Sequence, residues 1–156
     1  MNLRFAYLDE HTDAIPMLAQ WHHDEWQPVT PELSVADRIA GFTARARRGS
    51  VPTAIVGLVD DQVVGMACLI DCDIPSHCHL TPWLATVLVS PQHRRRGVGS
   101  ALCLRAVEEA RVLGVPTLYL FTFDKQSLYA RLQWLALEDA IYAGRPGTIM
   151  VRSVGV

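Results

Sequence analysis

The chain has 156 residues, half of them hydrophobic and 19% charged, with a formal net charge of −2. This composition excludes global disorder, and the charge excludes a surface basic enough for general nucleic-acid binding. No apolar run reaches the roughly 18 to 20 residues that a membrane-spanning helix needs, and the N-terminus lacks a signal peptide's apolar core. We therefore expect a cytoplasmic protein with no membrane partner, one domain over residues 1–156, and four reduced cysteines.

Hydrophobic periodicity predicts strands and helices that alternate along the chain. Thr12 can cap the first helix, and an acidic turn joins the second and third strands as a hairpin. In chain order we expect a strand over 3–8, helices over about 12–26 and 31–48, strands over 53–59 and 63–70, a polar loop over 71–81, a strand over 82–89, a helix over 98–113, a strand over 117–123, a helix over 125–132, and strands over 134–142 and 148–154. This order predicts one α/β domain.

The stretch VLVSPQHRRRGVGSAL, residues 87–102, joins a buried strand to an amphipathic helix. Gly97 and Gly99 let backbone N–H groups converge on an anion at the positive end of the helix dipole, with three arginines beside them. Leucine at position 102 excludes the G-x-G-x-x-G fingerprint, and the absence of lysine before Ser100 excludes a P-loop. The pattern predicts a phosphate or pyrophosphate cradle, with a merely charged turn as the alternative.

These features resemble the GNAT superfamily of acyl-CoA-dependent N-acyltransferases, in which R/Q-x-x-G-x-G/A binds the pyrophosphate of acetyl-CoA. The resemblance covers nearly the whole chain, because the order of elements is also the family's. The stretch TFDKQSLYARLQW, 122–134, is similar to the family's closing motif, although Gln133 stands where glycine is usual and Thr122 where asparagine is common. The PWLA strand resembles a bacterial subgroup, and 118–134 more distantly resembles the enzyme that acetylates the N-terminus of actin.

The resemblance implies a mixed, mostly antiparallel sheet of about seven strands, flanked by about four helices and splayed after the fourth strand. It implies acetyl-CoA as co-substrate and direct attack by a primary amine, carried by a small molecule or a peptide. A homodimer formed by pairing of the C-terminal strands of two subunits is a further possibility. A non-catalytic acyl-CoA sensor on the same fold is the alternative function.

The resemblance also assigns roles to residues of this sequence. Tyr129 is the expected general acid that protonates the departing sulfur, and an N–H of Val89 or Leu88 is expected to stabilise the oxyanion. Glu25, Trp26 and Trp83 are expected to line the acceptor pocket. The residues expected to bind the cofactor are Val87, Leu88, Val89, Arg94, Arg95, Arg96, Gly97, Val98, Gly99, Ser100 and Thr122.

The general base is open, because the fourth strand contains no acidic residue. Candidates in the first helix and in the polar loop are His22, His23, Asp24, Glu25, Asp71, Asp73, His77 and His79. The loop sequence DCDIPSHCHL contains metal-ligand residue types, but their spacing matches no usual zinc module. We expect a loop without metal, with a metal site and a Cys72–Cys78 disulfide as alternatives.

Overall fold

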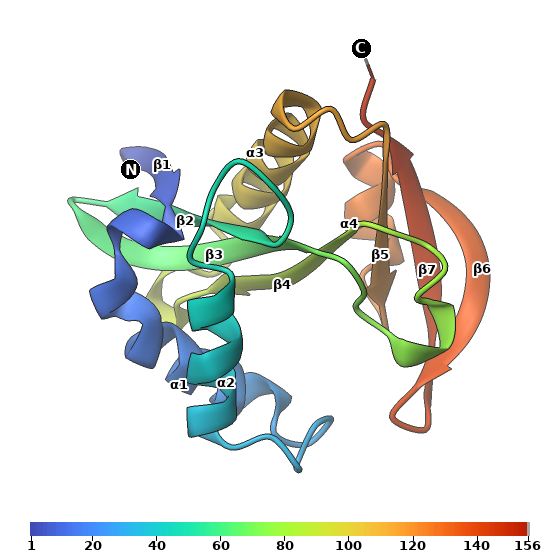
Figure 1. Cartoon of the computed structure of the whole chain (residues 1–156), viewed down its shortest axis with the longest axis horizontal. Helices are drawn as coiled ribbons and strands as arrows, with labels where there is room; N and C mark the ends of the chain where they lie inside the picture. Colours follow the sequence, from blue (N-terminus) through green and yellow to red (C-terminus); the bar gives the residue numbers. More distant parts are fainter. Residues whose placement is uncertain (156) are drawn as a thin grey trace.

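A computed structural model describes residues 1–155 and confirms the predicted α/β fold and order of elements (Figure 1). Val156, the last residue of the predicted domain, lies outside the described residues. The strands are β1 Leu3–Tyr7, β2 Thr53–Val59, β3 Gln62–Ile70, β4 Trp83–Val89, β5 Thr117–Thr122, β6 Leu135–Tyr142 and β7 Arg145–Ser153. The helices are α1 Ile15–Trp26, α2 Val35–Ala44, α3 Val98–Val112 and α4 Gln126–Arg131.

Helix ends differ from the prediction where local hydrogen bonds decide them. Ser34 caps α2 in a capping box: its hydroxyl accepts from the Asp37 N–H at 3.0 Å, and its own N–H donates to the Asp37 carboxylate at 2.9 Å. This helix therefore begins later than predicted. Thr12 does not cap α1, because it lies in a separate 3-10 turn before Ile15.

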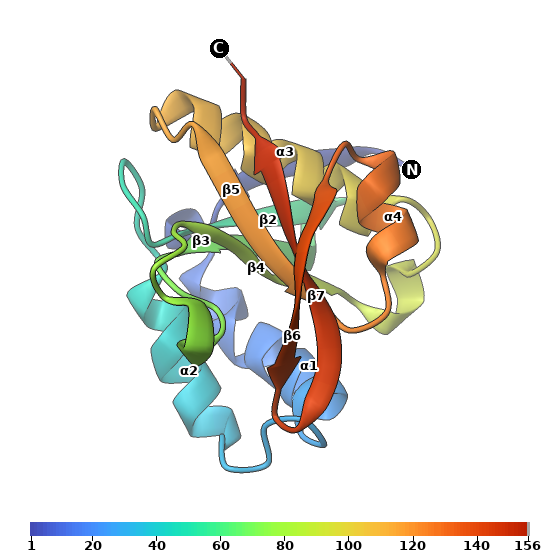
Figure 2. The same cartoon turned by 90° about the vertical axis from the view of Figure 1, so that its right-hand side faces the viewer.

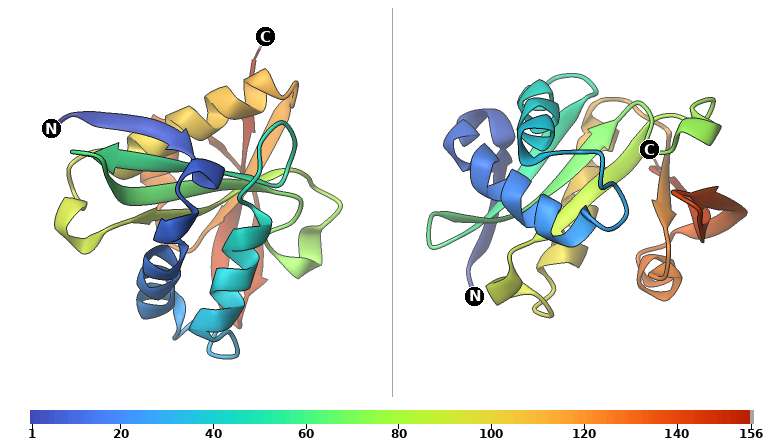
Figure 3. Two further views of the ribbon diagram at one scale, coloured as in Figure 1. Left: turned by 60° about the vertical axis from the view of Figure 1, so that its left-hand side comes forward. Right: turned by 90° about the horizontal axis from the view of Figure 1, so that it is seen from below.

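The strands form one sheet in the order β1-β2-β3-β4-β5-β7-β6 (Figure 2). Helices α1 and α2 cover one face and α3 covers the other (Figure 3). Along β2, Val56 packs into the core with α1 and α2, whereas Ile55 packs into the core with α3. Burial on both faces explains why this strand is apolar throughout rather than alternating.

Strands β4 and β5 are parallel neighbours that separate soon after they meet. Within the described residues they share one register pair, Trp83 with Tyr119. Beyond it, β4 contains a β-bulge, since the three-residue step from Ala85 to Leu88 lies opposite a two-residue step in β3. Thr86 in the bulge has a φ of 55°, and bulges of this kind bend a strand. The predicted splay is therefore present, and Figure 1 shows the two halves of the sheet turned apart.

Strand β6 forms an edge of the sheet and is largely exposed. Its apolar side chains Leu135 and Ile141 are 70% and 69% exposed. Such an edge can pair with another strand, so the homodimer stays a prediction that this surface would serve. Among residues 1–155, no helix combines the length and the apolar character needed to cross a membrane.

The loop between β3 and β4 corrects the expectation of four reduced cysteines. Cys72 and Cys78 form a disulfide, whereas Cys68 and Cys103 are buried free thiols in the described part of the chain. A 3-10 turn at Pro75–His77 folds the loop back and brings the two Cα atoms of the disulfide within 5.1 Å. That separation is in the range that a disulfide requires.

Reduction of the Cys72–Cys78 disulfide is expected to lower the free energy of unfolding by about 2 kcal/mol, because the short cross-link restricts the unfolded chain. Urea unfolding with and without dithiothreitol measures the difference. The Cys72→Ser/Cys78→Ser double variant should match the reduced protein and should not respond to reductant. Identical wild-type midpoints in both conditions would contradict the expectation.

Candidate active site

Two connected cavities occupy the opening between β4 and β5 and the surface beside the glycine-arginine loop. The inner cavity, about 470 Å³, lies between the separating strands. The loop cavity, about 620 Å³, lies against the loop at residues 93–100. Their shared lining joins them into one path, and it consists of Glu25, Val87, Asp124, Lys125 and Leu128.

The loop cavity lies at the N-terminus of helix α3. Gly97, with a φ of 82°, caps α3 from the left-handed region that favours glycine. The first bond inside the helix runs from the Ala101 N–H to the Gly97 carbonyl at 3.0 Å, so the N–H groups of the preceding turn have no helical acceptor. In the described chain that turn contains no acidic residue. Val98, Gly99 and Ser100 all line the cavity, so the phosphate cradle stays a prediction that this helix N-terminus would serve.

The three arginines of the loop are not equivalent. Arg94 and Arg95 line the loop cavity, whereas Arg96 is exposed and does not. The Arg94 side chain donates to the Val89 carbonyl at 3.1 Å and lies 3.6 Å from the Glu25 carboxylate. These contacts hold Arg94 at the junction of the two cavities. The cofactor role predicted for Arg96 has no support from its position.

Three cationic or polar residues in the loop cavity were missed by the sequence analysis. Lys125 and Arg131 belong to the α4 segment, and His93 is held by a 2.7 Å hydrogen bond with Ser90. The spacing of Lys125, Leu128 and Arg131 at intervals of three was the available signal, because it places them on one helix face. The cavity therefore has positive charge on both sides.

Strand β4 lines the inner cavity with residues 84–87 and the loop cavity with Val87 and Val89. Leu88 lines neither cavity, because it lies opposite Met66 with a buried side chain. The Leu88 carbonyl lies so close to β3 that a Cβ on Gly65 would stand 2.6 Å from it. The position of Leu88 therefore gives no support to its predicted cofactor contact, and of the two predicted oxyanion donors Val89 is the one that lines a cavity.

Trp83 is a second correction. Its side chain is fully buried, its indole N–H donates to the Leu80 carbonyl at 2.5 Å, and it lines neither cavity. The strand is apolar on both faces, so the sequence did not show which face the indole occupies. Glu25 and Trp26, by contrast, do line the inner cavity, from the last turn of α1.

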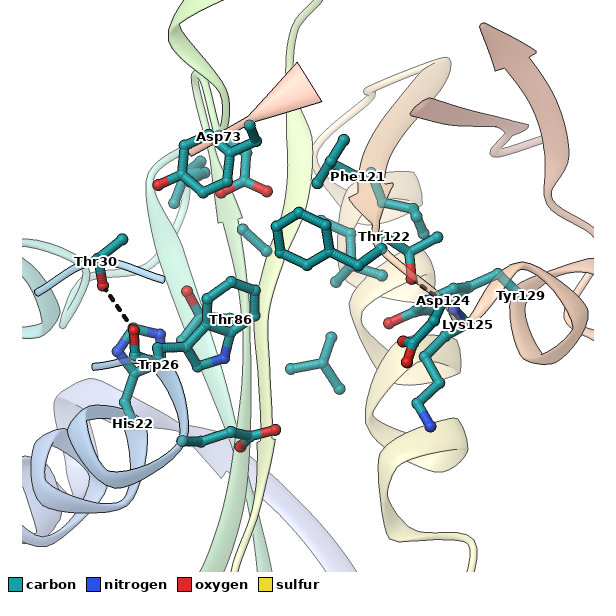
Figure 4. Close-up of a pocket in the computed structure, with 18 of the residues that line it drawn as sticks. His22, Trp26, Thr30, Asp73, Thr86, Phe121, Thr122, Asp124, Lys125 and Tyr129 are labelled. Atoms are coloured by element: carbon teal, nitrogen blue, oxygen red, sulfur yellow. Dashed lines mark hydrogen bonds between the residues drawn. The ribbon is translucent and has the colours of Figure 1, made fainter. Parts of the chain in front are cut away.

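Tyr129 lines the inner cavity and is held by the end of α4 (Figure 4). The Trp134 N–H donates to the Tyr129 carbonyl at 3.0 Å, and the Gln133 N–H donates to the Ala130 carbonyl at 3.1 Å. This is a Schellman motif, and Gln133 has the positive φ, 74°, that explains why glycine is usual there. Thr122, also on the inner cavity, accepts the Lys125 N–H at 2.9 Å and so fixes the start of the same segment.

Burial raises the pKa of Tyr129 well above its usual value, and the neighbouring Cys103 thiol and Asp73 carboxylate act in the same direction. The phenol therefore keeps its proton throughout the neutral pH range. Burial also raises the pKa of Cys103, to about 12. A protonated phenol in this cavity can donate to an anion that develops beside it.

Comparison with known proteins identifies the family. The model of the acetyltransferase (GNAT) family matches residues 15–133. The chain belongs to the GNAT acetyltransferase family. No curated protein matches the sequence, so the likeness to the actin-acetylating enzyme stays a prediction.

Solved structures share the fold of this acetyltransferase at low sequence identity. The chain is similar to yncA from Salmonella typhimurium, solved with its cofactor acetyl-CoA, at 18% identity and a TM-score of 0.74, over 100% of this chain and 96% of that one. It is similar to the PaiA N-acetyltransferase of Thermoplasma acidophilum in complex with coenzyme A, at 14% identity and a TM-score of 0.71, over 98% of this chain and 99% of that one. It is also similar to an aminoglycoside 6′-N-acetyltransferase complexed with coenzyme A, at 15% identity and a TM-score of 0.75, over 98% of each chain.

Most of the candidate bases of this acetyltransferase lie away from its cavities. His22, Glu25 and Asp73 line the inner cavity. Asp24 bonds to Gln20 at 2.8 Å, and His77 pairs with Glu138 at 3.1 Å. The candidates that line neither cavity are His23, Asp24, Asp71, His77 and His79. In residues 1–155 no group of three metal-ligating side chains is assembled.

His22 is unsuited to be the base despite its position. Its Nδ1 lies 2.9 Å from an Arg38 N–H, which assigns Nδ1 as the acceptor and leaves the proton on Nε2. Burial, together with the positive charges of Arg38 and Arg45, lowers the pKa of His22 to about 4. A neutral imidazole whose Nδ1 accepts from Arg38 and whose Nε2 carries the proton positions Arg38 rather than removing protons.

Acid is expected to destabilise the protein through His22. Its pKa is lower in the folded chain than in the unfolded one, so the stabilisation is complete above pH 6.5 and is lost as the pH falls towards 4. The shift corresponds to up to about 3 kcal/mol of unfolding free energy. Urea unfolding across this range should show a steeper pH dependence for the wild type than for His22→Asn, whose amide oxygen can accept from Arg38 without titrating. Parallel curves would contradict this assignment.

Proposed function

We propose that this GNAT protein is an acetyl-CoA-dependent N-acetyltransferase that moves an acetyl group to a primary amine by direct attack. One observation carries the proposal: the loop cavity at the N-terminus of α3 adjoins, and shares lining residues with, a cavity that contains a protonated tyrosine. The coenzyme A that the structural neighbours bind carries a pyrophosphate at one end and a thioester at the other. The path offers a place for each.

The loop residues suit the phosphates. The unbonded N–H groups of Val98, Gly99 and Ser100 would hold the pyrophosphate, with Arg94 and Arg95 supplying charge. The edge of β4 at Val87 and Val89 is open to the cavities and would contact the pantetheine arm. When bound, acetyl-CoA supplies the activated acetyl group.

The inner cavity suits the transfer step. The amine nitrogen forms its bond to the carbonyl carbon, and the Val89 N–H, which belongs to the adjoining loop cavity, would stabilise the charge that develops on the carbonyl oxygen. The carbon–sulfur bond then breaks, and the Tyr129 hydroxyl donates its proton to the sulfur. Binding both reactants in one cavity supplies a further part of the rate.

An acceptor panel tests the proposal. Purified protein is incubated with acetyl-CoA and phenethylamine, spermidine, a lysine-containing peptide or kanamycin, and the released thiol is measured; calorimetry measures acetyl-CoA binding. Amine-dependent thiol release is the expected result. Tight acetyl-CoA binding with no amine-dependent release from any acceptor would overturn the enzyme and favour the acyl-CoA sensor.

A further inference from the structure

Asp73 places a carboxylate in the inner cavity that has no hydrogen-bond or ion-pair partner in the described chain. It follows β3, next to the Cys72–Cys78 disulfide, and faces the cavity from the side opposite Thr122 and Lys125 (Figure 4). No hydrogen bond or ion pair reaches its side chain from residues 1–155. A half-buried carboxylate that opens on a cavity and has no partner in the described chain can take a cationic ligand as its partner.

Aromatic rings stand around the same space. Trp26 lies 6.1 Å from Phe123, and Tyr142 stacks on Phe123 at 6.3 Å between ring centroids. Phe121 meets Phe123 edge to face at 5.0 Å and Tyr142 at 6.0 Å. All four rings line the cavity. The Arg145 guanidinium already lies over Phe123, 4.4 Å from the ring centroid, so the rings favour an apolar or aromatic substituent and the carboxylate favours the cationic group.

The other charges around the cavity leave Asp73 available. Arg45 has the largest effect of any cation on Asp73, but in the described chain its guanidinium donates to the Thr86 hydroxyl at 2.9 Å and makes no hydrogen bond or ion pair with Asp73. Glu25 lies 3.6 Å from Arg94 at the junction with the loop cavity. The titratable groups that line the inner cavity besides Asp73 are His22, Glu25, Arg45, Asp124, Lys125, Tyr129 and Tyr142. Cys68 and Arg38 are nearby titratable groups that do not line it.

We propose that Asp73 binds the ammonium group of a cationic primary amine whose aromatic or apolar substituent lies against Trp26, Phe123 and Tyr142, and that Asp73 accepts the proton which frees the amine to attack. The inference rests on the proposed N-acetyltransferase activity and specifies its acceptor and its base. It also explains how a strand β4 without an acidic residue can serve this reaction.

The protons of the step balance. The ammonium gives one proton to the Asp73 carboxylate, and its free electron pair forms the bond to the carbonyl carbon. As the carbon–sulfur bond breaks, Tyr129 gives its proton to the sulfur. The second proton lost by the nitrogen restores Tyr129, and Asp73 releases its proton to water, so the net products are the amide, the thiol and one proton.

The protonation behaviour of Asp73 agrees with this role. Burial raises its pKa to about 6, against the opposing effect of Arg45. Above that pH the carboxylate is charged and can bind an ammonium, and it is a stronger base than an exposed aspartate. Burial raises the pKa of both Tyr129 and Tyr142, and the negative charge of Asp73 acts in the same direction on each.

The test compares Asp73→Asn with Asp71→Asn, an exposed acid of the same loop that lines neither cavity. With phenethylamine at pH 7, Asp73→Asn should lower kcat/KM by about 100-fold without changing the acetyl-CoA dissociation constant, while Asp71→Asn stays at the wild-type value. The wild-type kcat/KM should rise with pH through about 6 and then level. The Asp73→Asn value should keep rising towards the pKa of the amine, because only the neutral amine reacts.

A wild-type measurement covers the case in which Asp73→Asn does not fold. L-Phenylalanine adds one carboxylate to phenethylamine, and its kcat/KM should be at least tenfold lower because that charge meets Asp73. Equal values for the two compounds, or an Asp73→Asn variant as active as wild type, would overturn the inference while the acetyltransferase stands. Acetylation of spermidine without phenethylamine would overturn the acceptor class. Absence of transfer to every amine would instead defeat the proposed function.

Discussion

Tyr129→Phe is expected to lower kcat by about 100-fold or more, with little change in the dissociation constant of acetyl-CoA. The substitution removes the hydroxyl that would protonate the departing sulfur and keeps the ring, which packs edge to face on Trp134 at 6.3 Å. Because burial holds the Tyr129 pKa high, the wild-type phenol is protonated throughout the neutral range and the loss should be independent of pH there. Steady-state assays from pH 6.5 to 8.5, with calorimetry for binding, measure both quantities.

Tyr119→Phe is the matched control. Tyr119 lies on β5 against Trp83 in the sheet and lines neither cavity, so loss of its hydroxyl should leave kcat unchanged. Should Tyr129→Phe turn over at the wild-type rate, the proton must reach the sulfur from water or another group. Equal losses in both variants would instead indicate a general effect on the fold.

Gly99→Asp is expected to raise the KM for acetyl-CoA by about 100-fold. An aspartate in the first turn of α3 would accept from the N–H groups that are free for the phosphates and would repel those phosphates. Loss of two charge-assisted hydrogen bonds at about 1.5 kcal/mol each corresponds to this factor. The fold should be unaffected, since a Cβ at Gly99 meets only Val89 Cγ2, at 3.7 Å.

Leu104→Asp separates this effect from a change in net charge. Leu104 is a half-exposed residue of the same helix that lines neither cavity, so the variant adds the same charge away from the loop. Its KM for acetyl-CoA should remain at the wild-type value. A Gly99→Asp variant that binds acetyl-CoA normally would show that the pyrophosphate does not lie at the α3 terminus.

The parts that could be predicted from the sequence rest on local patterns. Two glycines between an apolar strand and an amphipathic helix predict an anion site wherever they occur, and Tyr129 sits in a short motif of recognisable spacing. The Asp60-Asp61 hairpin turn was likewise visible, and both residues adopt the positive φ that two-residue hairpin turns need.

The residues around the proposed amine-binding part of the inner cavity could not be predicted from local sequence patterns. It brings together Trp26, Asp73, Phe123 and Tyr142, which come from four segments separated by some 20 to 50 residues of chain. Asp73 was one of eight candidate bases, and no local pattern distinguishes it from Asp71, two residues earlier. The loop that turns the one towards the cavity and leaves the other in water is a tertiary feature.

The bulge in β4 has a consequence for how this site can change. The extra residue at Thr86–Val87 bends the second half of the strand, at the point where β4 separates from β5. Removing one residue between Ala85 and Leu88 would restore a regular ladder with Leu88 still opposite Met66, and would take away the bend that separates β4 from β5. We therefore expect substitutions along this strand to adjust what the protein binds, whereas a single deletion would abolish the binding space. The number of residues in β4 is itself a functional constraint.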